Sequence, residues 1–177
     1  MDDSLDASLD ALGDHGQAVS AANARSPGRI PEQPGLYSWW GDAEACGSVE
    51  TALEAPVGPL LYVGQAGAGR STATLASRVQ RNHLGGRRRR STFRRTLVAV
   101  LAGVRGCRPA DLTEDDLTAW MVEHLSVATV VSDDRSALHR LEAQALRRFD
   151  PPLNLMGMPP SPLRVRLRAL RAAARQD

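Results

Sequence analysis

A glutamate and an arginine of this sequence occupy positions where a buried helix face would normally carry an apolar side chain. Glu142 falls within the apolar stripe of the predicted helix 134–149, and Arg78 lies at the core edge of the predicted helix 72–84. A buried carboxylate must be neutralised, paired or bound to a metal, because an isolated buried charge is costly. The two side chains could therefore form a buried ion pair, and a metal site at Glu142 is the alternative that carries chemistry.

Both tyrosines of the chain lie in short extended segments that stand close together in the sequence. Tyr37 lies in PGLYSWW and Tyr62 in GPLLYVG, and these segments predict strands over 35–40 and 60–64. Because side chains alternate along a strand, the tyrosine of the second segment points away from its two aliphatic neighbours. A chain with only two tyrosines thus places both beside glycines in neighbouring predicted strands.

An amide and a histidine are two further candidates. Asn154 follows a Pro-Pro pair and stands between two leucines, so its amide could satisfy backbone groups or point into a pocket. His83 lies at the end of the predicted helix 72–84, next to the run GGRRRR. It is the one histidine of the four that we retain as a candidate site residue.

The charge distribution points to a polyanionic partner. Residues 1–60 contain two arginines and ten acidic residues, residues 61–177 contain twenty arginines and ten acidic residues, and residues 61–108 contain eleven arginines and no acidic residue. A segment of one sign is what nucleic acid requires, because phosphate contacts dominate its affinity. The alternative is a basic face that is merely solvated. The arginines expected to contact nucleic acid are Arg70, Arg81, Arg87, Arg88, Arg89, Arg90, Arg94 and Arg95.

The predicted elements form an α+β domain in which a small three-stranded sheet, its first two strands paired as a β-hairpin, is flanked by helices. Residues 1–29 have weak periodicity and many small residues, so we expect an acidic tail that is disordered or loosely helical. One domain is expected over 30–157, with an irregular segment over 41–58, and a basic C-terminal helix over 158–177. The predicted strands are 35–40, 60–64 and 125–131, and the predicted helices within the domain are 72–84, 91–103, 113–125 and 134–149.

Several classes of protein are excluded by composition. No apolar run approaches the length that spans a bilayer, and the acidic start MDDSLDASLD is typical of neither a secretory signal nor a transit peptide. We therefore expect a cytoplasmic protein without a membrane partner. Cys46 and Cys107 are far apart and lack the spacing of a zinc site or a disulfide framework, so we expect both to behave as small hydrophobic residues.

Taken in order, these segments resemble the GIY-YIG nuclease superfamily. GLY at 35–37 and YVG at 62–64 stand where the family has GIY and YIG. LASRVQRNH resembles the helix that carries the family's arginine and a histidine, and LHRLEAQALRRFDPPLN resembles the segment in which a helical glutamate precedes a P-x-L-N turn. The resemblance covers residues 35–155. It implies that the first two strands lie side by side and present both tyrosines to one face.

The resemblance implies hydrolysis of a phosphodiester with a single divalent cation, Mg²⁺ or Mn²⁺. Glu142 would be the only protein carboxylate on the metal, which suits a strongly hydrated cation. Arg78 would bind the scissile phosphate through its planar fork. Tyr37 would accept a proton from the attacking water, and Tyr62 would position that water or the phosphate.

The resemblance also assigns roles to the remaining candidates and to the partner. Asn154 would orient a tyrosine or the scissile group. His83 would be an accessory base or a phosphate contact. The partner would be nucleic acid, DNA more readily than RNA.

Three functions compete at this stage. The first is an active metal-dependent endonuclease, and the second is a nucleic-acid-binding module that keeps the fold without turnover. The third is a protein-interaction role, in which the acidic segment 1–29 mimics nucleic acid and covers the arginine surface. The retained Glu142 favours the nuclease, because a binding module has no need of a carboxylate on a buried face. The sequence assigns neither a physiological substrate nor an oligomeric state.

Overall fold

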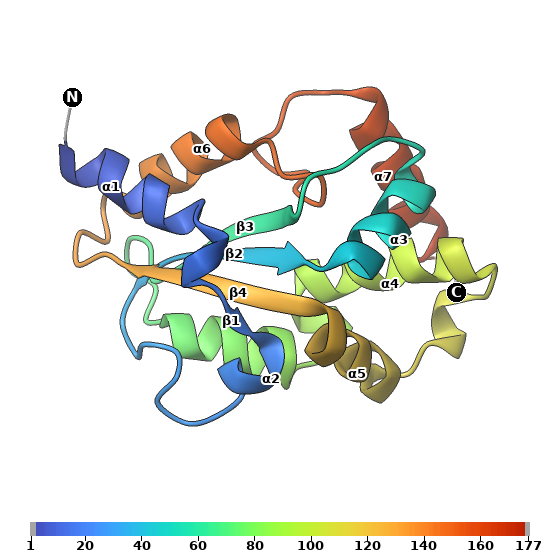
Figure 1. The fold of residues 1–177 in the computed structure, drawn as a ribbon, viewed down its shortest axis with the longest axis horizontal. Helices are drawn as coiled ribbons and strands as arrows, with labels where there is room; N and C mark the ends of the chain where they lie inside the picture. Colours follow the sequence, from blue (N-terminus) through green and yellow to red (C-terminus); the bar gives the residue numbers. More distant parts are fainter. Residues whose placement is uncertain (1–2, 176–177) are drawn as a thin grey trace.

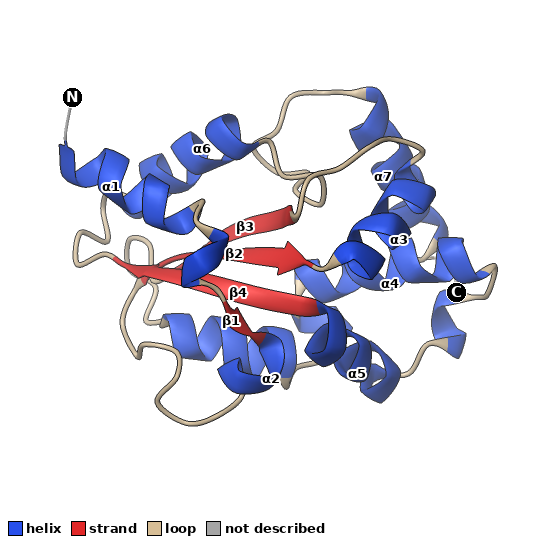
Figure 2. Cartoon of the chain, in the orientation of Figure 1, coloured by secondary structure: helices blue, strands red, loops and turns tan. Residues whose placement is uncertain are grey.

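The structure is a computed structural model that describes residues 3–175, with side chains from Asp6 onward. It is an α+β domain built on one antiparallel sheet with helices on both faces (Figures 1 and 2). The sheet has four strands rather than the predicted three. In spatial order they are β1 (Val19–Ser20), β4 (Leu125–Val131), β2 (Gly35–Gly41) and β3 (Leu60–Ala66).

The extra strand comes from the N-terminal segment. Of the two alternatives for residues 1–29, the described residues have the helical one, packed onto the sheet, and the expectation of disorder is wrong for them. The segment forms two α-helices around β1, which pairs with β4. Leu9 and Leu12 are buried against the sheet although the neighbouring residues are largely solvent-facing. Because only these two leucines are buried among residues 6–12, the sequence has little helical periodicity there. The added elements are α1 (Asp3–Leu12), the 3₁₀ turn η1 (His15–Gln17) and α2 (Ala21–Ala24).

The connection between the two tyrosine strands is also ordered, contrary to the prediction of an irregular segment over 41–58. Asp42 caps α3 (Ala43–Leu53) by accepting a hydrogen bond from the Ala45 amide at 2.8 Å. The strands β2 and β3 pair side by side as expected. They are joined by α3 and not by a hairpin turn. The remaining elements are η2 (Ser77–Leu84), η3 (Arg88–Arg90), α4 (Thr92–Arg105), η4 (Pro109–Asp111), α5 (Glu114–His124), α6 (Leu138–Phe149) and α7 (Pro162–Ala173).

The sheet separates two hydrophobic cores, as its alternating side chains require. On one face α1 and α6 pack over Leu36 and Val63. On the other face η2, α4 and α5 pack over Tyr37, Trp39 and Leu61. Leu61 shares this core with its neighbour Tyr62, because a register shift between Trp39 and Trp40 interrupts the alternation of β3, so the predicted opposite orientation is wrong for Leu61 and holds for Val63. Figure 1 shows α1 and α6 together on one side of the sheet and α2 with α5 on the other. Over residues 3–175 no helix is both long and apolar enough to cross a bilayer.

The helix expected over 72–84 has a different geometry from the one its periodicity indicated. Helical structure begins at Leu75, and η2 (Ser77–Leu84) is a π-helix, whose hydrogen bonds run from i to i+5. Side chains five residues apart would point roughly 140° apart on an α-helix, because it has about 3.6 residues per turn. The wider π turn brings side chains five residues apart close to the same side of the helix. Arg78 and His83 are five residues apart and face the same cavity.

Two glycines let the strands approach one another. Gly64 pairs with Tyr37 across β2 and β3, and a Cβ at Gly64 would lie 2.5 Å from the ring carbon Cζ of that tyrosine. The tyrosine ring thus lies flat over the one residue that leaves room for it. A Cβ at Gly35 would likewise collide with the backbone carbonyl of Val130 in β4. The glycines of GLY and YVG are therefore steric requirements of the sheet.

We expect Gly64→Ala to lower the free energy of unfolding by roughly 1–3 kcal/mol, the usual cost of overpacking a core. The measurement is urea unfolding followed by circular dichroism. Gly47→Ala is the matched control, because Gly47 lies inside α3 with open space where a Cβ would stand. That change should raise the free energy of unfolding by about 0.5–1 kcal/mol. Equal stability of Gly64→Ala and the wild type would contradict the steric role of Gly64.

Candidate active site

Five of the six predicted site residues line one cavity at the free edge of the sheet. The cavity has a volume of about 140 Å³ and lies beside β3, where η2, the start of α4 and α6 meet. Three further arginine or hydroxyl side chains border it, from Arg90, Ser91 and Thr92. The predicted residues that line the cavity are Tyr37, Tyr62, Arg78, His83 and Glu142.

Tyr37 is held in place by a chain of hydrogen bonds. Its hydroxyl lies 2.9 Å from His83 Nε2, and His83 Nδ1 lies 2.8 Å from Ser91 Oγ. Ser91 Oγ also accepts from the backbone amide of Arg94 as the N-cap of α4. The strand, the π-helix and α4 are thereby locked to one another at the site.

The same chain sets the protonation of its members. Burial lowers the pKa of His83 to about 3, with the charges of Arg78 and Arg94 adding to the effect, so the imidazole is neutral. Burial raises the pKa of Tyr37 well above its usual value, Tyr62 adds to the rise, and Arg78 opposes it. A neutral, buried imidazole with both nitrogens engaged orients Tyr37. It is a weak base, and it is not free to contact a phosphate.

Tyr62 stands beside Tyr37 on the same face of the sheet. The two rings stack at a centroid distance of 6.5 Å, and Phe93 holds the Tyr62 ring from the other side at 4.8 Å. Burial raises the pKa of the Tyr62 hydroxyl to about 12, and Glu142 contributes to the rise. Within residues 6–175 the hydroxyl makes no hydrogen bond, so it can bind a group that enters the cavity.

Arg78 and Glu142 face the cavity without pairing with each other. No ion pair joins them among the described residues, which excludes the buried ion pair that the sequence left open. Arg78 Nε is buried and has no hydrogen-bond partner within residues 6–175. Burial raises the pKa of Glu142, whereas His139 and Arg78 oppose the rise. A cation and an anion that line one cavity without pairing can each bind an oppositely charged part of a ligand.

The donor set fits a metal held by one carboxylate. In the described part of the chain no cluster of three or more acidic, histidine or cysteine side chains is arranged to bind a metal. Glu142 is nevertheless free of any ion pair there and lines a cavity large enough for water molecules. A single carboxylate with water in the remaining positions is a coordination that Mg²⁺ accepts, because it dehydrates reluctantly.

Asn154, the sixth predicted residue, lies outside this cavity and binds the edge strand. Its Nδ2 donates to the Val63 carbonyl at 2.8 Å, and its Oδ1 accepts from the Val63 amide at 2.9 Å. The Leu153 amide also donates to the Leu61 carbonyl at 3.0 Å. The free edge of β3 is thus satisfied on both sides of Tyr62. Both alternatives from the sequence are present, since the amide binds backbone groups and Asn154 also lines a second cavity that adjoins Tyr62.

The eight arginines expected at the surface divide into two groups. Arg94 is fully buried and binds Glu114 Oε2 at 2.8 Å, and Arg88 binds Glu114 Oε1 at 3.2 Å. Arg94 is part of the fold, so its prediction as a nucleic-acid contact is wrong, whereas Arg88 keeps 27% of its side chain exposed and stays a prediction. Glu114 could pair with them because α5 begins beside α4, which the sequence did not reveal. The exposed members of the group are Arg70, Arg81, Arg87, Arg89, Arg90 and Arg95.

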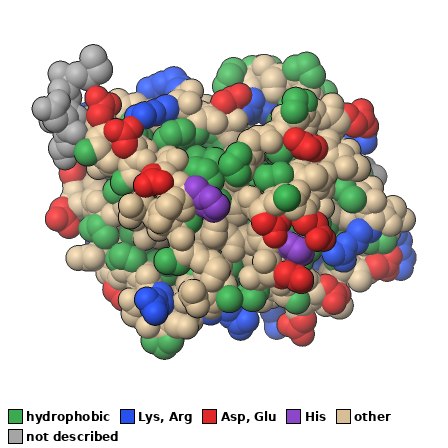
Figure 3. Space-filling view, viewed as in Figure 1, with side chains coloured by type: hydrophobic (Ala, Val, Ile, Leu, Met, Phe, Trp, Pro, Cys, Tyr) green, Lys and Arg blue, Asp and Glu red, His purple; other side chains and the backbone are tan. Residues whose placement is uncertain are grey.

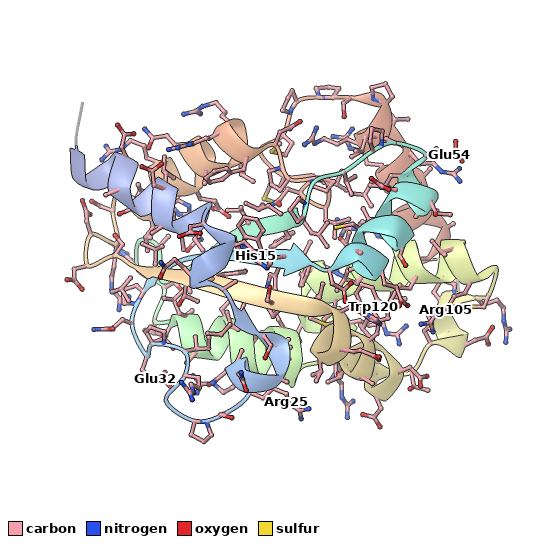
Figure 4. All side chains as sticks on the ribbon, in the orientation of Figure 1. His15, Arg25, Glu32, Glu54, Arg105 and Trp120 are labelled. Carbon is pink, nitrogen blue, oxygen red and sulfur yellow. The ribbon has the colours of Figure 1, made fainter. Side chains whose placement is uncertain are left out.

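On the face seen in Figure 3, acidic and basic side chains are interspersed among hydrophobic ones. Arg81 of η2 forms an exposed ion pair with Glu32 at 3.7 Å, and Figure 4 shows Glu32 on the loop that leads into β2. Such an exposed pair contributes little to stability.

Sequence reasoning missed Ser91 and Gly64 as parts of the site. Ser91 stands at the start of the predicted helix 91–103 and caps α4, but its second bond, to His83, depends on tertiary packing. Gly64 was visible as the glycine of YVG, and only the strand register shows that it faces Tyr37. Two C-terminal arginines, Arg171 and Arg175, were also missed, and they line a groove that adjoins Tyr62.

Comparison with protein families gives a match over most of the chain. The model of a family described as the GIY-YIG catalytic domain matches residues 35–173, which include all six predicted site residues. Comparison with curated proteins and with solved structures gives no significant match.

The lowered pKa of His83 makes stability depend on pH. The unfolded chain takes up this proton near pH 6.5 and the folded chain only near pH 3, so the free energy of unfolding falls as pH drops through that window. In His83→Gln, the slope should decrease by up to about 1.4 kcal/mol per pH unit, as measured by urea unfolding between about pH 6 and pH 4.5. His15→Gln, at an exposed position, should keep the wild-type slope. Parallel slopes for His83→Gln and the wild type would contradict the burial of a neutral imidazole.

Proposed function

The chain belongs to the GIY-YIG catalytic domain family, and from that premise we propose that it is an endonuclease that hydrolyses phosphodiester bonds of nucleic acid, DNA in preference to RNA. The observation that carries the proposal is the cavity in which Glu142 and Arg78 are unpaired beside two tyrosines. A protein that only binds nucleic acid gains nothing from a carboxylate there, since it repels phosphate.

Glu142 is the proposed ligand of a divalent cation, Mg²⁺ or Mn²⁺. Such a cation would stabilise the negative charge that develops on the phosphate and on the leaving 3′ oxygen. Arg78 faces the same cavity and would bind two oxygens of the phosphate through its fork, which satisfies the buried Nε. Removing one preorganised group of this kind typically lowers the rate by roughly 10²–10³-fold.

Tyr37 is the proposed proton acceptor for the attacking water. It reacts as the phenolate, because only that form accepts a proton effectively at neutral pH. The raised pKa of Tyr37 keeps the phenolate a minor species, and Arg78 acts against that rise. His83 holds the hydroxyl at 2.9 Å and is a positioning residue. Tyr62, with its unpartnered hydroxyl, would position the water or the phosphate.

We expect metal-dependent nicking of supercoiled plasmid DNA by the wild-type protein with Mg²⁺ or Mn²⁺, and none with EDTA. Glu142→Ala should reduce the rate by at least about 10²-fold, because among residues 6–175 it removes the only carboxylate that lines the cavity. Glu123→Ala, at an exposed glutamate of α5, is the matched control and should cleave at the wild-type rate. Salt-sensitive DNA binding without cleavage would replace the nuclease with a binding module. Equal cleavage rates for both variants would show that Glu142 is not the metal ligand.

The role of Tyr37 predicts a pH dependence. The logarithm of kcat should rise with a slope near 1 between about pH 7 and pH 9, since the reactive phenolate becomes more abundant as pH rises. Tyr37→Phe should lower kcat by roughly 10²–10⁴-fold and flatten the profile. Tyr62→Phe should lower kcat and keep the slope. A wild-type slope in Tyr37→Phe would show that another group accepts the proton.

A further inference from the structure

A second and larger cavity begins at the candidate active site. It has a volume of about 700 Å³ and shares Tyr62, Thr92 and Glu142 with the catalytic cavity. From there it runs between α6, the segment 153–157 and the C-terminal helix α7. This volume lies in the range of pockets that enclose most of a small organic molecule, roughly 300–1,000 Å³. A group that enters this groove is therefore continuous with whatever occupies the catalytic cavity.

Three arginines converge on the groove from α4 and from the C-terminal end of the chain. Arg95, Arg171 and Arg175 all line it, and all three also line a small cavity of about 60 Å³ beside it. None of them forms an ion pair within residues 6–175. Burial lowers the pKa of Arg171, and the charges of Arg95 and Arg175 lower it further. Cations that repel one another at close range are stabilised by an anion placed among them.

The floor of the groove is apolar. Leu146, Leu153 and Leu155 line it, and Met156 lies at its rim with 90% of its surface exposed. A large exposed apolar side chain at a concave site is a feature of binding surfaces. An apolar floor with cations close by matches the two parts of a nucleotide, a flat base and a phosphate. A base within a duplex has both faces covered by its neighbours, so only an unpaired base can lie on this floor.

We propose that the groove binds an unpaired nucleotide next to the scissile phosphate, so that the substrate is single-stranded on one side of the cleavage position. The base packs on Leu155 and Met156, and the phosphate that follows binds Arg95 and Arg171. This inference rests on the proposed function for the identity of the catalytic cavity. It goes beyond that function by naming the substrate class, single strands and junctions between duplex and single strand.

The test measures binding and needs no cleavage. Fluorescence anisotropy in EDTA compares a labelled blunt duplex with the same duplex bearing a short single-stranded extension. The wild-type protein should bind the extended duplex about tenfold more tightly, the effect of removing roughly 50 Å² of apolar surface from water. Arg171→Gln should remove this preference and lower the salt slope of the extended duplex by about 0.7, the contribution of one single-strand phosphate. Arg168→Gln, an exposed arginine of α7 outside the groove, should keep both.

A second variant keeps the test independent of folding. Met156→Glu adds a carboxylate at an exposed position, so it should leave the melting temperature unchanged and abolish the preference for the extended duplex. Equal affinity of the wild type for both substrates would overturn the proposal, and so would equal weakening by Arg171→Gln and Arg168→Gln. If the protein shows the predicted preference but never cleaves, the proposed nuclease activity is wrong and the nucleotide site in the groove stands. If it cleaves but shows no preference, the nucleotide site is wrong and the nuclease activity stands.

Discussion

The hydrogen bond between Tyr37 and His83 joins the three elements on which the site depends. One partner lies on a central strand and the other on a π-helix, and Ser91 at the start of α4 completes the chain. The bond is possible only because Gly64 leaves space for the tyrosine ring and because the wider helical turn places His83 on the same side as Arg78. The catalytic cavity is what remains between these elements once they are locked together.

The site lies where the sheet ends, and this location explains its electrostatics. A cavity over the middle of the sheet would enclose its charges completely, whereas the edge strand β3 leaves Glu142 and Arg78 partly accessible. Arg94 shows the contrast, since it is fully buried and is paired with Glu114 as well as with a carbonyl. The fold neutralises one buried arginine and leaves another with an unsatisfied nitrogen. Arg94 is therefore a structural charge, whereas the unpartnered Nε of Arg78 is available to bind a ligand.

The edge of a sheet also exposes unpaired backbone groups, and here the chain covers them itself. Asn154 pairs with both backbone groups of Val63, and Leu153 pairs with Leu61. These bonds hold the backbone on both sides of Tyr62. The segment that follows then forms the floor of the groove, so one turn of chain both closes the sheet and shapes the approach to the site.

The sequence by itself determined the strands that carry the tyrosines, the charged residues on apolar helix faces and the excess of arginine, because these follow from local periodicity and composition. It predicted the cavity residues Glu142 and Arg78, since a charge within an apolar stripe is a local violation. Only the tertiary structure decided that η2 is a π-helix, that residues 3–29 add a strand, and that Arg88 and Arg94 pair with Glu114. Each of these depends on partners distant in sequence, which local patterns do not encode. The roles of Asn154 and Ser91 were decided in the same way, because a polar side chain binds whichever backbone group or ring the fold brings to it.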